Sequence, residues 1–114
     1  MTALYGDTVT ILRAGYLVDK YGNPTSQRDW ANATRTPVSG VSVQPDVSTE
    51  ATGDRGTITT GWRLFTPKGR DLDLLATDRV EFDGMALEVD GEIARYRVSG
   101  RVHHVEARLK RVTG

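Results

Sequence analysis

Apolar residues recur at every second position along most of the chain, and β-branched residues and arginine dominate these segments. This alternation predicts strands, because successive side chains of a strand point to opposite faces of a sheet. The pattern is clearest over residues 7–13, 38–44, 57–66 and 102–112. No segment shows the spacing of a long amphipathic helix, so we expect an all-β protein.

Shorter alternating segments follow one another in the second half of the chain and are separated by glycine-containing turns. The segments are residues 79–82, 85–89 and 93–98, and the turns are Asp83-Gly84, Asp90-Gly91 and Ser99-Gly100. Asp-Gly between alternating segments is a strong hairpin signal. Residues 71–76 predict either a short helical turn or an irregular crossing. Six or seven short strands at these intervals predict one domain over residues 1–114, a small closed β-barrel or sandwich.

Three breaks in the alternation predict irregular segments. Residues 19–24 combine Gly22, Asn23 and Pro24 and are expected to form a turn or exposed loop, with Trp30 following in the same region. Pro45 is expected to end the second strand. Residues 46–56 then have neither the period of a strand nor a full set of core residues, so we expect a long mobile loop there.

Composition places the chain among ordinary folded proteins: 38% of its 114 residues are hydrophobic, 26% are charged and none is cysteine. A disulfide framework and thiolate chemistry are therefore excluded, and no apolar run approaches the roughly 20 residues that span a bilayer. The 15 basic and 15 acidic residues give no net charge. They are unevenly distributed, because residues 46–92 carry eleven acidic and five basic side chains while residues 93–114 carry one acidic and six basic.

This polarity has two interpretations. Acidic and basic strands can pair within one molecule, or an acidic face of one protomer can meet a basic face of the next. Under the second interpretation the candidate interface residues are Arg95, Arg97, Arg108 and Lys110, on a cationic face of the last two strands. Trp30 is a further candidate, because tryptophan is enriched at interface hot spots.

Few residues are candidates for catalysis or metal binding. His103 and His104 are the only histidines, and as neighbours on a strand they should point to opposite faces, so we expect no shared metal site. Asp71 and Asp73 form at most a weak oxygen-ligand cation site. Because no nucleophile motif, phosphate-binding glycine loop or metal-ligand motif is present, we expect neither a catalytic centre nor a cofactor.

A series of short motifs is spread along the whole chain: T-I-L-R (residues 10–13), D-K-Y-G-N (19–23), G-V-S-V-Q-P (40–45), W-R-L-F-T-P (62–67), D-R-V (78–80), E-V-D-G-E (88–92) and V-E-A-R-L-K-R-V (105–112). In this order the motifs resemble the head-to-tail stopper, or head-closure, family of long-tailed bacteriophages. These motifs consist of turns and strands rather than reactive side chains. The resemblance therefore implies a fold and a role in assembly.

The resemblance implies a virion protein that is assembled in the host cytoplasm, without a membrane partner, as a ring of six or twelve copies in the neck between head and tail. Its expected partners are a portal-bound adaptor, a tail terminator or tail tube protein, and packaged double-stranded DNA in the channel. The loop of residues 46–56 is the candidate gate, with Val47, Ser48, Thr49, Glu50, Thr52, Asp54 and Arg55 as its channel residues.

Two alternatives remain open from the sequence. A neighbouring neck or tail component, such as a tail terminator, would share the ring and the lack of catalysis. A small nucleic-acid-binding β-barrel would use the arginine-rich face and an exposed tryptophan, and would bind nucleic acid in a salt-sensitive way as a monomer.

Overall fold

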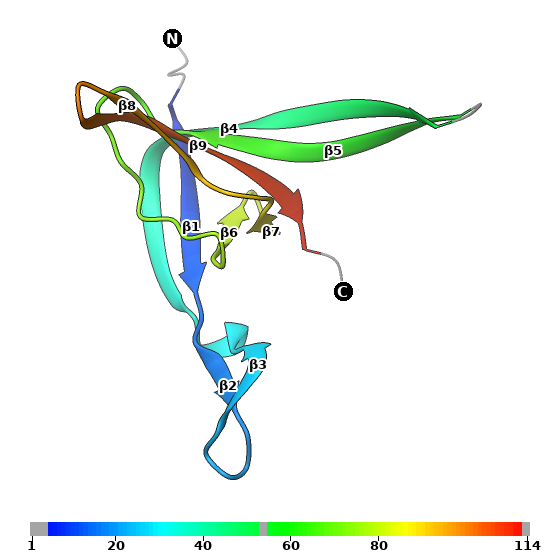
Figure 1. The fold of residues 1–114 in the computed structure, drawn as a ribbon, viewed down its shortest axis with the longest axis vertical. Helices are drawn as coiled ribbons and strands as arrows, with labels where there is room; N and C mark the ends of the chain where they lie inside the picture. Colours follow the sequence, from blue (N-terminus) through cyan, green and yellow to red (C-terminus); the bar gives the residue numbers. More distant parts are fainter. Residues whose placement is uncertain (1–4, 53–54, 113–114) are drawn as a thin grey trace.

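The protein is described here by a computed structural model that covers residues 5–52 and 55–112, with the backbone alone over 47–52 and 55–60. Within these residues the secondary structure consists of nine strands and one 3₁₀ helix (Figure 1). The elements are β1 (Asp7–Arg13), β2 (Tyr16–Val18), β3 (Pro24–Arg28), η1 (Trp30–Asn32), β4 (Thr34–Thr52), β5 (Arg55–Phe65), β6 (Arg79–Phe82), β7 (Met85–Val89), β8 (Ala94–Val98) and β9 (Arg101–Arg111). No helix in the described part of the chain is long and apolar enough to cross a membrane.

Six strands close into a barrel. They follow the order β5-β4-β1-β6-β7-β9, and antiparallel pairing of β5 with β9 joins the two ends. β8 adds to the sheet as an extra strand on β9. The predicted all-β fold, a small closed barrel of six or seven strands, is confirmed.

Alternate residues of the barrel strands fill its interior. β1 directs Val9 and Ile11 inward, as the alternation predicts, and Leu64 of β5 is fully buried. The remaining members of this core are Val41, Val43, Leu72, Leu74, Val80, Leu87, Val89, Val105, Ala107 and Leu109. Leu72 and Leu74 come from the connection between β5 and β6, which is an irregular crossing and not a helical turn. That crossing therefore contributes directly to the hydrophobic core.

β4 pairs first with β1 and then with β5, because it bends at Gly40. It pairs with β1 through Val41 and with β5 from Ser42 onwards. Gly40 has a φ of 74°, a left-handed conformation that glycine adopts without steric cost, and it lies at a register shift of the β1–β4 ladder. The prediction that Pro45 ends the strand is wrong. Beyond Val41 the described residues pair β4 with β5 only, so Pro45 lies on an edge strand, where its missing N–H is tolerated.

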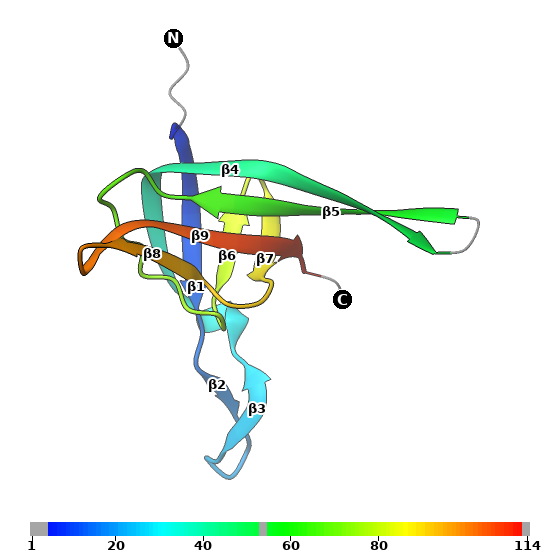
Figure 2. The same ribbon diagram turned by 45° about the horizontal axis from the view of Figure 1, so that its top comes forward.

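The segment predicted to be an irregular loop, residues 46–56, is instead largely strand. β4 and β5 pair in register from Asp46 opposite Gly61 to Thr52 opposite Arg55, and the ladder extends far beyond the barrel (Figures 1 and 2). We call this extension, residues 46–52 and 55–61, the long arm. Its valine, isoleucine and threonine residues favour extended backbone, and a two-stranded ribbon away from the core needs no apolar face. The mobility expected of this segment stays a prediction.

A second, shorter arm is formed by β2 and β3. Residues 19–23 make its turn, as predicted, and Asp19 organises it: its carboxylate accepts hydrogen bonds from the backbone N–H groups of Tyr21 and Asn23, both at 2.9 Å. The short strands on either side were not predicted. In Figures 1 and 2 this arm projects from the barrel in a different direction from the long arm.

Two of the three predicted glycine turns, Asp83-Gly84 and Ser99-Gly100, are confirmed as hairpin turns. Asp90-Gly91 instead leads from β7 into β8, and these two strands both pair with β9 and not with each other. Asp83 and Gly84 have φ values of 52° and 77°, and Ser99 and Gly100 have 52° and 78°. Two successive positive φ values are typical of the type I′ turn, whose twist matches that of the flanking strands. These turns fix the β6–β7 and β8–β9 hairpins.

Candidate assembly surfaces

The predicted gate residues lie on the long arm. Val47, Ser48, Thr49, Glu50 and Thr52 belong to β4 and Arg55 belongs to β5, while Asp54 lies outside the described residues. Within the described part, the arm strands pair only with each other, because β5 meets β9 over Trp62–Phe65 alone. Each arm strand therefore presents one unpaired edge, which can accept a further strand.

Three of the predicted interface cations lie beside acidic residues of the same molecule. Arg95 donates from Nε to Asp71 Oδ1 at 3.3 Å and from Nη2 to the carbonyl oxygens of Leu72 and Leu74. Arg108 lies 4.0 Å from Asp46, and Lys110 lies 3.5 Å from Glu88. Much of the charge polarity of the sequence is therefore balanced within one protomer, which was the first of its two interpretations.

The other two predicted interface residues have different surroundings. Arg97 is exposed on β8 near the turn into β9. Trp30 is only partly exposed in η1, and the Arg79 guanidinium carbon lies 4.2 Å from the centre of a Trp30 ring. This cation–π contact occupies one face of the indole. Trp30 and Lys110 line one surface pocket, whereas Arg97 lies opposite Val102 beside the β8–β9 turn.

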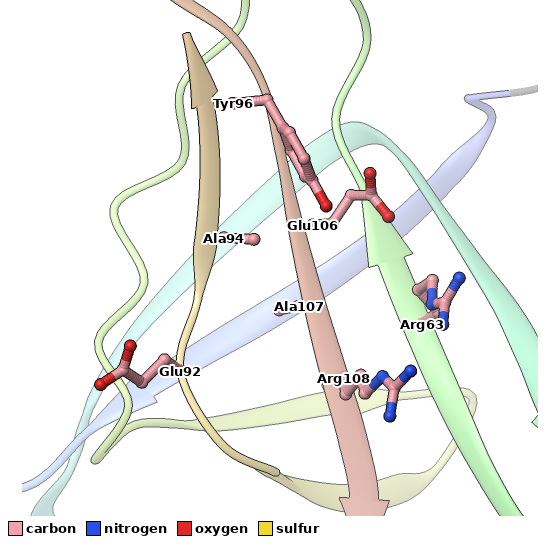
Figure 3. A pocket seen from close by; sticks show the side chains of 7 residues that line it. All are labelled: Arg63, Glu92, Ala94, Tyr96, Glu106, Ala107 and Arg108. Carbon is pink, nitrogen blue, oxygen red and sulfur yellow. The ribbon is translucent and has the colours of Figure 1, made fainter.

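A shallow pocket of about 200 Å³ lies on the outer face of β5, β9 and β8 (Figure 3). It is lined by Arg63, Glu92, Ala94, Tyr96, Glu106, Ala107 and Arg108. Arg63 and Arg108 stand directly opposite each other in the β5–β9 register, an arrangement that is unfavourable for like charges. Asp46 offsets this repulsion, because its Oδ2 accepts from Arg63 Nη2 at 3.4 Å and lies 4.0 Å from Arg108 Nε. The pocket can receive a polar or charged group of another molecule.

The histidines are not on opposite faces, and that prediction is wrong. The β8–β9 register shifts at this point: Tyr96 is opposite His104 while Arg97 is opposite Val102, so His103 is the extra residue of a β-bulge. The bulge brings the two Nδ1 atoms to 2.8 Å from each other. His104 also stacks on Tyr96, with ring centroids 4.6 Å apart, and its Nε2 lies 2.9 Å from Glu106 Oε2.

The two aspartates considered as a weak cation site bind different arginines. Asp71 pairs with Arg95, while Asp73 pairs with Arg13, which also holds the buried Asp78. The hydrogen bonds from Arg13 to Asp78 and Asp73 raise the pKa of its guanidinium further above its already high value. Across the described residues, no three His, Cys, Asp or Glu side chains converge on a point where they could hold a metal ion.

Sequence reasoning missed the exposed apolar residues of the two hairpins. Tyr16, Val18 and Tyr21 of the short arm are 49%, 61% and 75% exposed, and Val98 of β8 is 60% exposed. The alternation would have placed some of these residues in a core. A strand that leaves the barrel keeps its alternation but loses the layer that would cover it, so the sequence pattern alone does not distinguish the two cases.

Comparisons with known proteins support the fold. The chain is similar to a chain of a solved structure described as the virion of a native gene transfer agent (GTA) particle, with a TM-score of 0.57, 15% sequence identity and 94% of each chain covered. At this identity the likeness concerns the fold, and it extends over nearly all of both chains. No protein-family model and no curated protein matches the sequence.

Proposed function

We propose that this chain is a structural virion protein that forms a ring in the neck of a tailed bacteriophage or phage-like particle, closes the DNA-filled head and provides the docking surface for the tail. Two independent observations support the proposal. The sequence motifs resemble head-to-tail stoppers along the whole chain, and the barrel has the fold of a chain from a phage-like virion. In this proposal the protein acts by assembly and not by catalysis.

The long arm is the observation that carries the proposal. A hairpin that extends seven paired positions beyond the barrel, from Asp46 opposite Gly61 to Thr52 opposite Arg55, has no partner strand within the described part of its own chain. An isolated two-stranded ribbon is only marginally stable in water. In a ring, copies of the arm can meet on the axis and pair along their free edges, which satisfies backbone groups that a lone chain leaves to solvent.

Such a plug would obstruct a channel without binding DNA tightly. The arm segment contains Asp46, Glu50, Asp54 and Arg55, so its charges are mixed. A mixed-charge ring neither holds the phosphate backbone through many cation contacts nor repels it as a uniformly acidic ring would. This property suits a gate that retains the genome and later lets it pass.

The proposal is tested with particles produced without this chain. We expect heads that package DNA, acquire no tails and then lose the DNA. We expect purified protein to bind these heads as a ring that electron microscopy shows at the portal vertex. A tail terminator would instead be found on the end of isolated tails. Salt-sensitive binding of DNA by the monomer, with no affinity for heads, would favour the nucleic-acid-binding alternative.

A further inference from the structure

Many charged residues around the barrel have an opposite charge within reach in the same molecule. The ion pairs are Arg13 with Asp73 and Asp78, Arg35 with Glu81, Arg63 and Arg108 with Asp46, Arg95 with Asp71, His104 with Glu106 if the histidine is protonated, and Lys110 with Glu88. Pairs of this kind leave little net charge for recognition of another molecule. The charged side chains outside these pairs are therefore the better candidates for contacts with another molecule.

Two such cations lie together at one end of the β8–β9 hairpin. Arg97 and Arg101 flank the Ser99-Gly100 turn, both are exposed, and neither forms an ion pair with the described residues. Arg101 is opposite Val98 and Arg97 is opposite Val102, so the two arginines project from opposite faces of the hairpin tip. Val98 lies between them in the sequence and is 60% exposed, and the neighbouring Tyr96 is 49% exposed. We call Arg97, Val98 and Arg101 the basic tip.

Two acidic side chains that are likewise outside the ion pairs of the described residues lie at the other end of β8. Asp90 and Glu92, in the connection from β7 to β8, are exposed and form no ion pair in the described part of the chain. In Figure 3 the Glu92 carboxylate points away from Arg63 and Arg108. We call Asp90 and Glu92 the acidic connection.

The two charged groups cannot neutralise each other within one protomer. The five residues of β8 separate the two groups. At about 3.3 Å per residue, the length of this strand exceeds the distance over which two side chains form an ion pair. In Figures 1 and 2 the β8–β9 turn lies on one side of the barrel and the connection that leaves β7 lies on the other. A protein with complementary groups on two different sides has the arrangement that a head-to-tail ring interface requires.

We infer that the basic tip of one copy docks on the acidic connection of the next copy and that this contact joins neighbouring subunits of the ring. The inference rests on the proposed function, and it names the contacting residues. Arg97 on one face of the hairpin tip and Arg101 on the other contact Asp90 and Glu92 of the adjacent chain, which also covers Val98 beside Arg101. The interface cations that sequence analysis singled out, Arg95, Arg108 and Lys110, keep their partners within each protomer.

A second copy fits the basic tip better than DNA does. Two arginines around an exposed valine provide only two phosphate contacts, whereas DNA binders usually use many. DNA would also leave Val98 against a charged backbone and would give the acidic connection no role. A neighbouring subunit covers the valine and pairs both charged groups at once.

The contact is tested by disulfide trapping, because the chain contains no cysteine. Particles are assembled with the double variant Arg97→Cys/Glu92→Cys and mildly oxidised, and the chain is analysed on a non-reducing gel. The two cysteines lie at opposite ends of β8, so a disulfide between them joins two chains. We expect covalent multimers up to the size of the closed ring. Lys20→Cys/Glu92→Cys is the control, because it has the same number of cysteines but places one on the short arm.

Charge exchange provides the second test. Arg97→Glu/Arg101→Glu should lower incorporation into particles at least about tenfold, because it places four acidic groups together. Adding Asp90→Arg and Glu92→Arg in the same chain should restore incorporation. Lys20→Glu/Lys68→Glu makes the same change in net charge and should have little effect.

The outcomes separate the inference from the proposed function. Incorporation of the cysteine variant with no more cross-linking than its control overturns the contact, and so does failure of the charge exchange to restore a loss caused by the first reversal. In both cases the wild-type chain is still found in the neck. Absence of the wild-type chain from particles would overturn the proposed function and the contact with it.

Discussion

Arg13 of β1 binds the buried carboxylate of Asp78, with Nε 3.0 Å from Oδ1 and Nη2 2.8 Å from Oδ2. Only 1% of the Asp78 side chain is exposed, against 39% for Arg13. The same carboxylate accepts the backbone N–H of Leu75 at 2.8 Å. This contact therefore ties the β5–β6 crossing, which carries Leu72 and Leu74 into the core, to the first strand of the barrel.

Replacing Arg13 by methionine should destabilise the protein by about 3 kcal/mol, because it leaves a buried carboxylate without its cation. The double variant Arg13→Met/Asp78→Asn should recover part of this loss, since no uncompensated charge remains. Urea unfolding of the three proteins measures both quantities. Equal stability of Arg13→Met and the wild type would show that water satisfies Asp78 equally well.

The bend at Gly40 should be intolerant of a side chain. A Cβ at this position would lie 2.6 Å from Arg70 Nη1, which donates to the carbonyl oxygens of Ser39 and Gly40. Gly40→Ala should therefore lose about 1 kcal/mol more than Gly22→Ala. Gly22 is the matched control, because it also has a positive φ, of 83°, but has open space around its Cβ position. Equal losses in urea unfolding would contradict a role for the Arg70 contact.

The exposed pair of Arg35 and Glu81 should change the titration of Glu81 but should contribute little to the stability of the fold. The hydrogen bond from Arg35 lowers the pKa of the Glu81 carboxyl. A lowered pKa in the folded state contributes stability above the unfolded-state pKa, and this contribution is lost as the pH falls through the folded-state value. Arg35→Met should shift the Glu81 midpoint upward in a carbon-13 NMR titration while leaving the melting temperature nearly unchanged. An identical midpoint in both proteins would mean that the pair does not form in solution.

The bulge at His103 predicts specific imidazole tautomers at neutral pH. Ionised Glu106 can only accept, so His104 donates to it from Nε2 and presents the lone pair of Nδ1. His103 then donates from Nδ1 to His104. Nitrogen-15 NMR should show these two tautomers, and Glu106→Leu should abolish the preference at His104. The opposite tautomer at His104 in the wild type would rule out this chain of hydrogen bonds. We expect His103→Ala and His104→Ala to leave assembly nearly unchanged.

The barrel could be predicted from the sequence, because its alternating apolar residues face the core and its turn residues adopt the conformations that their types favour. Val9, Ile11 and Leu64 alternate and are buried, and the Asp83-Gly84 and Ser99-Gly100 turns adopt the conformations that their residue types favour. Where a strand lies outside the barrel, this agreement ends. Residues 46–52 of the long arm have no core to face and lack the alternating pattern, although each of them is paired with a residue of the neighbouring strand.

Local irregularities were not predictable for a related reason. A β-bulge changes which face each side chain occupies, and the sequence around His103 and His104 does not signal it. Several ion pairs depend on register between strands distant in sequence, such as Glu88 with Lys110 and Asp46 with Arg108. Composition showed that the charges are segregated along the chain, but only the register shows that many of them pair within one molecule.

The long arm can be removed without disturbing the barrel, because Asp46 and Gly61 remain paired where the arm leaves it. Replacing residues 47–60 by a two-residue Asn-Gly turn keeps Asp46 opposite Gly61 and closes the ribbon with a favoured hairpin. The core described above is built by residues outside this segment. We therefore expect the shortened protein to fold with nearly unchanged stability in thermal unfolding, and to bind heads as the wild type does.

The most direct measurement is the protection of packaged DNA from nuclease in heads that carry the wild-type or the shortened protein but no tails. Tailless heads are assembled in cells that produce one of the two proteins, the bound copies are counted, and the DNA that survives DNase is quantified. At equal occupancy, we predict full protection by the wild type and loss of DNA with the shortened protein. Full protection by the shortened protein at the same occupancy would contradict the account and would place the long arm outside the gate.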